Sequence, residues 1–427
     1  MDSRQRTSTA RWGAATVVAL LTLTGCGSVG DDGPPQVSRT STSLGPADAS
    51  PAPDASARPT ATSTPEVSVE TVVEGLDVPW GLAPLPGGAL LISLRDEARL
   101  VVVDPDAGTT TDVTGPGADA LAAQTTPDGE GGLLGVARDP GSGDVFVYRT
   151  GADDNAVLRG ALDGTVLGGL TTVLDGIPRA GHHDGGGLAF GPDGFLYVGT
   201  GDAGDGEASQ DRASLAGKIL RVTTDGDPAP GNPDAGSPVW TFGHRNVQGL
   251  AWDASGRMFA SEFGQNTWDE LNEIEPGGDY GWPDVEGPGL EGQPQAGDGT
   301  VAPVAWWPTS DASPSGLAVT DDAVYLAGLR GERLWRVPFG GTASGADEGG
   351  DGAGPGPSKD AVDADGSVRP LGEPQALLAG ELGRLRNVAP VEPGGGDADG
   401  LWVLTNNTDG RGSPRDGDDR LVRVTFG

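Results

Sequence analysis

From Val67 onward, short runs of β-branched and aromatic residues alternate with turns rich in Pro, Asp and Gly, and no long helical period interrupts them. One unit recurs: a Gly-Leu-Ala-like step, a turn, and then an apolar run. The copies start 52 to 71 residues apart, at Gly81, Gly135, Gly187, Gly249, Gly316 and, more weakly, Asn387. Repeats of this length suit four-stranded blades with long loops. The pattern therefore predicts an all-β fold, a six-bladed β-propeller of four-stranded antiparallel blades.

The two ends of the repeat region are expected to meet. The strand predicted at Val67–Val73 can complete the last blade beside Leu421–Phe426, which closes the ring and removes its open edges. A Gly/Asp/Ala-rich stretch at about 340–369 interrupts the repeats, and we interpret it as a surface loop insertion. Residues 66–427 thus form one predicted propeller domain.

The N-terminal segment has the features of an export signal. Basic residues precede a short apolar stretch that ends in Leu23-Thr-Gly-Cys26, so residues 1–26 resemble a lipoprotein signal with Cys26 as the lipidated residue. An ordinary secretory signal with an incidental cysteine is the alternative. Residues 27–65 are rich in Ser, Thr, Pro and Ala and are predicted to be a disordered tether. We expect an exported protein, lipid-anchored to the outer face of the bacterial cell membrane and touching the membrane only through that anchor.

Composition excludes some functions. The formal net charge is −35, so nucleic-acid phosphates would be repelled. Cys26 is the only cysteine, which excludes a disulfide framework and a thiolate metal site.

The repeat also predicts where polar residues gather. If the Gly-Leu-Ala strand is the innermost of each blade, residues just before it and just after the next, antiparallel strand share one mouth of the central channel. The residues before it include Glu130, His183, Arg245, Asn246, Gln248, Arg384 and Arg386. The residues after the next strand include Asp202, Gly264, Gln265, Arg330, Asn406 and Asn407. A concave surface with convergent polar groups is the usual place for a ligand.

The chemistry of this mouth is that of an anion site with a base. Several arginines together indicate an anionic partner such as a planar polycarboxylate, although each could instead pair with a nearby acid. His183 is the candidate general base, with Asp202 placed to orient it; a purely structural histidine is the alternative. The irregular loop at 261–272 offers carbonyls and carboxylates that suit calcium, but acidic loops are common in this chain.

Several motifs carry a resemblance to a known family. They are Gly129-Glu-Gly-Gly-Leu-Leu-Gly135, the His182-His183 segment, Leu215-Ala-Gly-Lys-Ile-Leu-Arg221, Gly243-His-Arg-Asn-Val-Gln-Gly-Leu250 and Gly277-Gly-Asp-Tyr-Gly-Trp-Pro283. Over roughly Val69 to Phe426 the chain resembles the soluble quinoprotein glucose dehydrogenases and the related aldose sugar (glucose/sorbosone) dehydrogenases.

The resemblance implies a propeller that binds pyrroloquinoline quinone (PQQ) and calcium and oxidises the anomeric hydroxyl of a sugar to a lactone, passing electrons to an external acceptor. His183 would be the base and Asp202 its support. The resemblance assigns PQQ to Arg245, Asn246, Arg330, Arg384 and Arg386, calcium to the carbonyls of Gly264 and Gln265, and substrate to Glu130 and Gln248.

Three positions depart from the glucose dehydrogenases. Glu130 replaces a glutamine that contacts substrate, Arg330 replaces a quinone-binding lysine, and Gly187 replaces an arginine. The first change affects sugar preference and the second changes the reach of a charge. Two other functions stay open at this stage: a calcium-dependent sugar lactonase, and a lipoprotein binding module that has lost redox chemistry.

Overall fold

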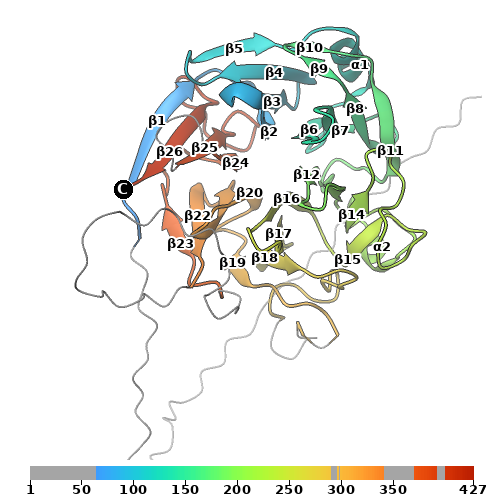
Figure 1. The fold of residues 1–427 in the computed structure, drawn as a ribbon. Helices are drawn as coiled ribbons and strands as arrows, with labels where there is room; N and C mark the ends of the chain where they lie inside the picture. The colour runs from blue at the N-terminus through green and yellow to red at the C-terminus, as the bar shows by residue number, and fades with distance from the viewer. Residues whose placement is uncertain (1–63, 290–295, 298, 341–369, 392–399) are drawn as a thin grey trace, which may run out of the picture. The chain divides into compact units, whose positions relative to one another are not determined.

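Six four-stranded antiparallel sheets surround a central axis in the described part of the chain (Figure 1). This computed structural model describes residues 64–289, 296–297, 299–340, 370–391 and 400–427. The predicted lipidation site Cys26, nearly all of the predicted tether and nearly all of the predicted insertion lie outside the described residues. Within the described ranges no helix is long and apolar enough to span a membrane. The prediction of a six-bladed β-propeller is confirmed.

Each blade is a meander of four strands. Blade 1 comprises β2 (Pro79–Pro84), β3 (Leu90–Leu94), β4 (Arg99–Asp104) and β5 (Thr109–Asp112), and blade 2 comprises β6 (Leu133–Arg138), β7 (Val145–Thr150), β8 (Asn155–Gly160) and β11 (Thr171–Ile177). Blade 3 comprises β12 (Leu188–Phe190), β13 (Leu196–Gly199), β14 (Lys218–Val222) and β15 (Val239–Phe242), and blade 4 comprises β16 (Val247–Trp252), β17 (Met258–Glu262), β18 (Trp268–Ile274) and β19 (Ala305–Pro308). Blade 5 comprises β20 (Pro314–Val319), β21 (Ala323–Gly328), β22 (Arg333–Pro338) and β23 (Gln375–Leu377). Blade 6 comprises β24 (Leu385–Pro390), β25 (Gly400–Thr405), β26 (Leu421–Phe426) and β1 (Val67–Val73). The short elements are η1 (Pro86–Gly88), α1 (Pro116–Gln124), α2 (Gly206–Gln210) and the small hairpin of β9 (Leu162–Asp163) and β10 (Val166–Leu167).

The ring closes as the sequence predicted. Strand β1 pairs antiparallel with β26, with Val67 opposite Phe426 and Val69 opposite Val424. In Figure 1 the two strands lie side by side although they come from opposite ends of the domain. Pairing the ends covers the edge that an open last blade would expose.

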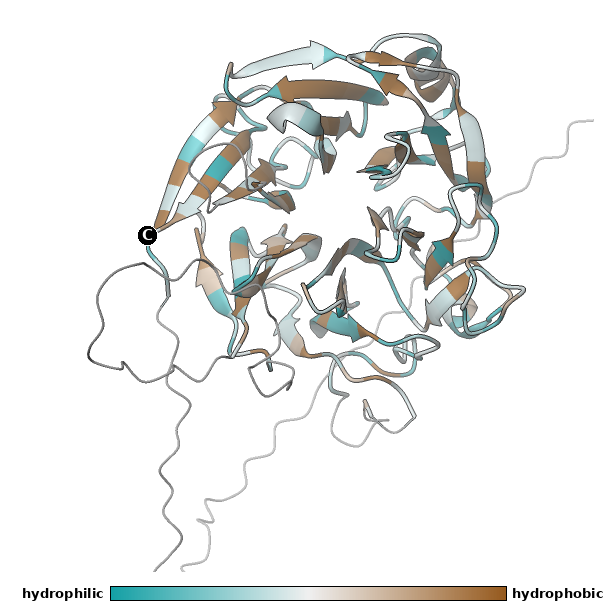
Figure 2. Ribbon diagram, viewed as in Figure 1, coloured by the Kyte–Doolittle hydropathy of each residue, from teal (hydrophilic) through white to brown (hydrophobic). Residues whose placement is uncertain are grey.

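Apolar side chains fill the spaces between neighbouring blades. The described residues contain one buried cluster for each pair of adjacent blades, such as the cluster of Phe146 and Tyr148 of blade 2 with Val198 and Leu220 of blade 3. Strands such as β1 alternate apolar and polar positions, as Figure 2 shows, because successive side chains point to opposite faces of a sheet. Strands in the middle of the blades, such as β3 and β21, are buried at every position because neighbouring blades cover both faces of the sheet, which matches the short apolar runs of the sequence.

The glycine of the repeat is where neighbouring blades touch. A β-carbon on Gly135 would lie 2.1 Å from the carbonyl oxygen of Gly186 in the next blade, and similar clashes with the next blade's residues would occur at Gly81, Gly249 and Gly316. Asn387 holds the same position in blade 6, and its Nδ2 donates to the carbonyl of Trp80 in blade 1 at 3.0 Å. The contact between blades 6 and 1 thus includes a side-chain hydrogen bond from Asn387, whereas a glycine occupies this position in the other repeats.

Replacing Gly249 by alanine should lower the free energy of unfolding by about 2 to 3 kcal/mol, because overpacking at a rigid contact forces the backbones apart. The new β-carbon would lie 2.5 Å from the carbonyl oxygen of Ser315. Denaturant unfolding measures the change. Gly169→Ala is the matched control, because no atom of the described ranges lies within 4 Å of its β-carbon position. Equal stability of the two variants would contradict the assigned role of the repeat glycine.

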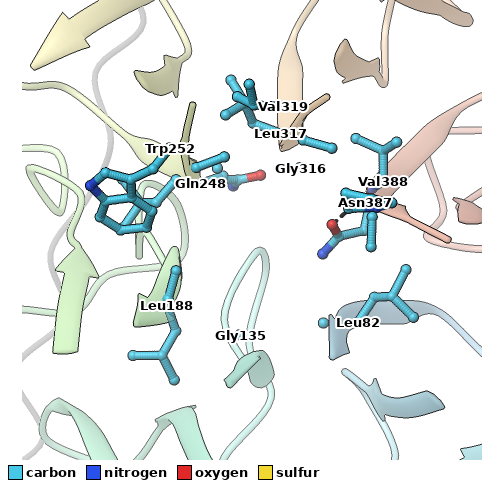
Figure 3. Close-up of a pocket in the computed structure, with 18 of the residues that line it drawn as sticks. Leu82, Gly135, Leu188, Gln248, Trp252, Gly316, Leu317, Val319, Asn387 and Val388 are labelled. Atoms are coloured by element: carbon cyan, nitrogen blue, oxygen red, sulfur yellow. Dashed lines mark hydrogen bonds between the residues drawn. The ribbon is translucent and has the colours of Figure 1, made fainter. Parts of the chain in front are cut away.

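An axial cavity of about 480 Å³ lies between the innermost strands. Apolar side chains such as Leu82, Leu188, Leu317 and Val388 surround it, as Figure 3 shows, and Gln248 is among its few polar residues. In the part of the chain that the structure describes, neither His183 nor any arginine lines this cavity. The histidine and the arginines predicted to form a site therefore lie outside this cavity.

Candidate functional site

His183 and Asp202 form a directly bonded pair at this mouth. The His183 Nδ1 atom lies 2.7 Å from Asp202 Oδ1, and the histidine side chain is 12% exposed whereas the aspartate is 2% exposed. Burial by itself raises the pKa of Asp202, but hydrogen bonds from His183, the backbone N–H of Gly204 and the indole of Trp282 outweigh it and leave that pKa below its usual range. The carboxylate is thus ionised and holds Nδ1 as a donor, which leaves Nε2 as the basic nitrogen.

The backbone around His183 is arranged for close contact. His183 has a φ of 58°, and its carbonyl oxygen accepts from the N–H of Ala203 at 3.2 Å. A β-carbon on Gly201 would lie 1.8 Å from that same oxygen, so only glycine fits there. Strained backbone of this kind concentrates at functional sites, where surrounding contacts over-determine it.

Buried polar groups support the turn that carries His183. Asp184 Oδ1 accepts from the backbone N–H of Ala180 at 3.1 Å and from Asn155 Nδ2 at 3.0 Å. The Tyr148 hydroxyl donates to the carbonyl of Asp184 at 2.7 Å. Burial raises the pKa of Asp184 to about 6, although the Asn155 and Ala180 hydrogen bonds oppose that change. Asp184 is thus a buried carboxyl group that holds the turn before His183 in place.

Replacing Asp184 by asparagine should make stability less dependent on pH. Because the folded pKa is raised above the unfolded value, the native state loses stability as pH rises through the window from about 4 to 6. Asparagine avoids that loss, so the variant should gain up to about 3 kcal/mol relative to the parent between pH 4 and pH 7. Denaturant unfolding at both pH values measures this difference. Asp175→Asn, an exposed site on β11, is the control, and an equal gain in both variants would contradict the assignment.

Trp282 and Arg245 extend the site beyond the histidine. Trp282 Nε1 donates to Asp202 Oδ2 at 2.9 Å, and the Arg245 guanidinium lies 5.5 Å from the centre of the Trp282 ring. Burial lowers the pKa of Arg245 below its usual value, and attraction to Asp202 and other nearby carboxylates offsets only part of that effect. Gln210 of α2 donates to the carbonyl of Trp282 at 2.8 Å and so anchors the indole. One indole therefore connects the histidine–aspartate pair to a cation.

A cluster of arginines occupies the neighbouring part of the mouth. Arg384 and Arg386 are almost completely buried, and Asp409 Oδ2 lies 2.9 Å from Arg384 and 3.9 Å from Arg386. Burial, with repulsion from Arg95 and Arg384, lowers the pKa of Arg386 to about 9, although Asp409 opposes this. Positive charge therefore exceeds the negative charge that Asp409 supplies, which favours an added anion.

The amide side chains at the mouth have different roles. Gln248 Oε1 accepts from Arg386 at 3.0 Å and from Ser315 at 2.8 Å, so it is engaged within the protein. Asn246 Oδ1 accepts from the backbone N–H of Gly185 at 3.0 Å, while its Nδ2 is buried and has no partner among the described residues. A buried donor without an acceptor is costly and uncommon.

Arg386 and Arg330 differ from the other predicted contacts. Arg386 donates to Ser315 and Gln248, and with the Asn406 amide turned over it also donates to Asn406 at 2.8 and 2.6 Å, so its donors are satisfied by protein. Arg330 follows β21 and is exposed, and it makes no hydrogen bond to the other predicted site residues within the described ranges. The structure thus joins Arg386 to the site network and leaves Arg330 apart from it.

The loop after β17 carries the two carbonyls predicted to hold calcium. Glu286 Oε1 accepts from four consecutive backbone N–H groups, those of Gln265, Asn266, Thr267 and Trp268, at 2.7 to 3.2 Å. Neither Gly264 nor Gln265 has a carbonyl oxygen that accepts a hydrogen bond from the described residues. No group of three or more His, Cys, Asp or Glu side chains there is arranged to hold a metal ion, so the calcium prediction depends on backbone oxygens.

A family model described as glucose/sorbosone dehydrogenase matches residues 76–413 of this chain. The chain belongs to this family. The match spans all six blades, from the start of blade 1 to the loop before β26.

This family member is similar to several proteins named as sugar dehydrogenases. A PQQ-bound aldose sugar dehydrogenase from Streptomyces coelicolor is 49% identical, with a TM-score of 0.71, and the match covers 85% of this chain and 100% of that one. Aldose sugar dehydrogenase YliI of Escherichia coli is 31% identical over 59% of this chain and 73% of that protein. Quinoprotein glucose dehydrogenase B of Acinetobacter calcoaceticus is 28% identical over 51% of this chain. The chain spans 60% and 52% of the length of the first two curated relatives that it matches.

Four residues at the mouth of this family member were not predicted from the sequence: Arg95, Trp282, Asp409 and Arg411. Arg95 directly follows β3, the second strand of blade 1, just as Asp202 lies shortly after β13, the second strand of blade 3. The same place in the repeat therefore predicts Arg95 at the mouth as well. Trp282 lies in a motif that carried the family resemblance but was given no role. Asp409 and Arg411 come from the long connection between β25 and β26, where no local pattern marks them.

Proposed function

We propose that this protein oxidises an aldose, or a similar polyol, at the anomeric hydroxyl to the lactone, using PQQ and calcium. The observation that carries the proposal is the His183–Asp202 pair beside a buried arginine cluster, in a member of the glucose/sorbosone dehydrogenase family. A base beside an excess of buried positive charge suits proton removal next to an anionic electron acceptor.

The residues present fit PQQ. Its carboxylates match the guanidinium groups of Arg245 and Arg384, since planar guanidinium and carboxylate groups pair bidentately. The unpartnered Nδ2 of Asn246 fits a carbonyl or carboxylate oxygen of such a ligand. Arg386 would act by holding Gln248 and by adding charge, because its own donors are engaged. When bound, the quinone supplies a two-electron acceptor for hydride.

Residues of the chain itself would remove the proton from the substrate hydroxyl. His183 Nε2 takes the proton of the substrate hydroxyl, and Asp202 stabilises the imidazolium that forms. Trp282 and the N–H of Gly204 fix the aspartate, so the imidazole keeps its orientation during proton transfer. The free carbonyls of Gly264 and Gln265 are oxygen ligands of the type that calcium prefers, and they lie in the loop whose Gln265 accepts from Arg245 at 3.3 Å.

Titration of the purified protein with PQQ and calcium, followed by addition of an aldose, tests the proposal. Tight, calcium-dependent binding and bleaching of the quinone absorbance on sugar addition would support it. Binding without reduction by any sugar of a broad panel would contradict the dehydrogenase function and favour a binding module. Absence of binding would overturn the quinoprotein proposal, and hydrolysis of a sugar lactone without quinone would favour a lactonase.

A further inference from the structure

An ion pair spans the mouth between two loops that are far apart in the sequence. Arg411 Nη1, in the connection between β25 and β26, lies 2.7 Å from Glu130 Oε1, in the loop before β6. The arginine side chain is 56% exposed and the glutamate side chain 18%. An exposed pair of this kind contributes little to stability, so stability alone does not explain it.

Both partners are held in place by the candidate site. The other carboxylate oxygen of Glu130 accepts from the backbone N–H of His183 at 3.0 Å, which puts the charge beside the base. The backbone N–H of Arg411 donates to Asp409 Oδ1 at 2.9 Å, and the second oxygen of Asp409 pairs with Arg384. The pair therefore connects the arginine cluster to the backbone of the base.

The pair leaves hydrogen-bonding capacity unused. Within the described residues, only Nη1 of the Arg411 guanidinium has a protein acceptor, so the other N–H groups face solvent beside the site. Burial raises the pKa of Glu130, but the N–H of His183 and the Arg411 guanidinium outweigh it and leave that pKa below its usual range. Glu130 is thus a carboxylate with lone pairs to spare, and Arg411 is a donor beside it.

We propose that Glu130 and Arg411 form a charge-compensated specificity element that binds hydroxyl groups of a neutral sugar beside the oxidised carbon. This inference rests on the proposed function and names its substrate class. A hydroxyl group both donates and accepts, so vicinal hydroxyls can bind the carboxylate and the guanidinium together. A sugar carboxylate is attracted by Arg411 but repelled by Glu130, and a sugar ammonium is attracted by Glu130 but repelled by Arg411, so the compensated pair gives neither charged sugar a net advantage over a neutral one.

Removing one charge of the pair tests the inference. Glu130→Gln keeps an acceptor for the His183 N–H and leaves Arg411 uncompensated, so kcat/KM for D-glucuronate relative to D-glucose should rise about three- to tenfold. Arg411→Gln should lower that ratio and raise the ratio for D-glucosamine by a similar factor. The double variant should return both ratios toward those of the parent. Arg99→Gln, which breaks an exposed ion pair with Asp112 on the outer strands of blade 1, is the control and should change neither ratio.

Equilibrium binding separates this inference from the proposed function. Calorimetric titration with D-glucuronate and D-glucosamine needs no turnover, and the two single variants should change their affinities in opposite directions. If the parent oxidises no sugar, the proposed function is wrong. The calorimetric affinities of the variants still test whether Glu130 and Arg411 select against charged sugars. Ratios and affinities that stay within about twofold in both single variants, or move in the same direction, would overturn the inference.

Discussion

Replacing His183 by alanine is expected to lower kcat about 10² to 10⁴-fold while PQQ still binds, because a positioned general base contributes about that factor to the rate. The imidazole is the one group at the mouth with a free basic nitrogen next to a buried carboxylate, within the described residues. Steady-state kinetics of the loaded protein, together with a quinone titration, separates loss of turnover from loss of binding.

Two further variants sharpen this result. Asp202→Asn keeps the hydrogen-bonding shape but removes the charge that stabilises the imidazolium, so kcat should fall about 10² to 10⁴-fold. His182→Ala removes the adjacent exposed imidazole, whose ring packs edge-on against His183 at a centroid distance of 4.4 Å, and should cost less than about tenfold. A loss in His182→Ala that equals the loss in His183→Ala would contradict the assignment of the base.

The second large effect concerns the arginine cluster. Arg384→Gln should weaken PQQ binding about 30-fold or more, because truncating one partner of a buried charge pair costs about 2 to 5 kcal/mol. Arg384 is 7% exposed, and its donors also hold the carbonyl of Asn406 and the carboxylate of Asp409. Absorbance titration of the quinone into the variant measures the change in dissociation constant.

Arg336→Gln is the matched control for Arg384→Gln. Arg336, on β22 of blade 5, is 6% exposed and bonds to Asp322 in the β20–β21 turn and to Gln375 on the outermost strand β23. Its loss should leave PQQ affinity within about twofold of the parent. If Arg384→Gln bound PQQ as tightly as the parent, the cluster of Arg384 and Arg386 would not be the PQQ-binding site.

Local periodicity was enough to predict the propeller. The repeat glycines mark backbone contacts between neighbouring blades, and the short continuous apolar runs mark strands whose two faces are both buried, such as β3 and β21. Because an antiparallel turn returns the chain to the same end of a blade, the positions of His183 and Asp202 at one mouth also followed from the repeat alone. The structure places these two side chains in direct contact.

Periodicity was not enough for groups on long connections. Arg411 and Glu130 are 281 residues apart in sequence, and Trp282 is 80 residues from the Asp202 that it holds. No local pattern shows that the donors of Arg386 are all bonded to protein acceptors, whereas Asn246 Nδ2 has no acceptor among the described residues. Burial and partner geometry decide such differences, and neither is a property of local residue spacing.

The sequence by itself determined the number of blades, the closure of the ring and the set of polar residues at one mouth, because each follows from a repeated local pattern of strand and turn. Only the tertiary structure decided which of those side chains meet, which remain apart, and which residues from the long loops join them. The physical reason is that a blade's register is fixed by neighbouring strands, whereas a long loop is fixed by contacts with distant blades that no local pattern encodes.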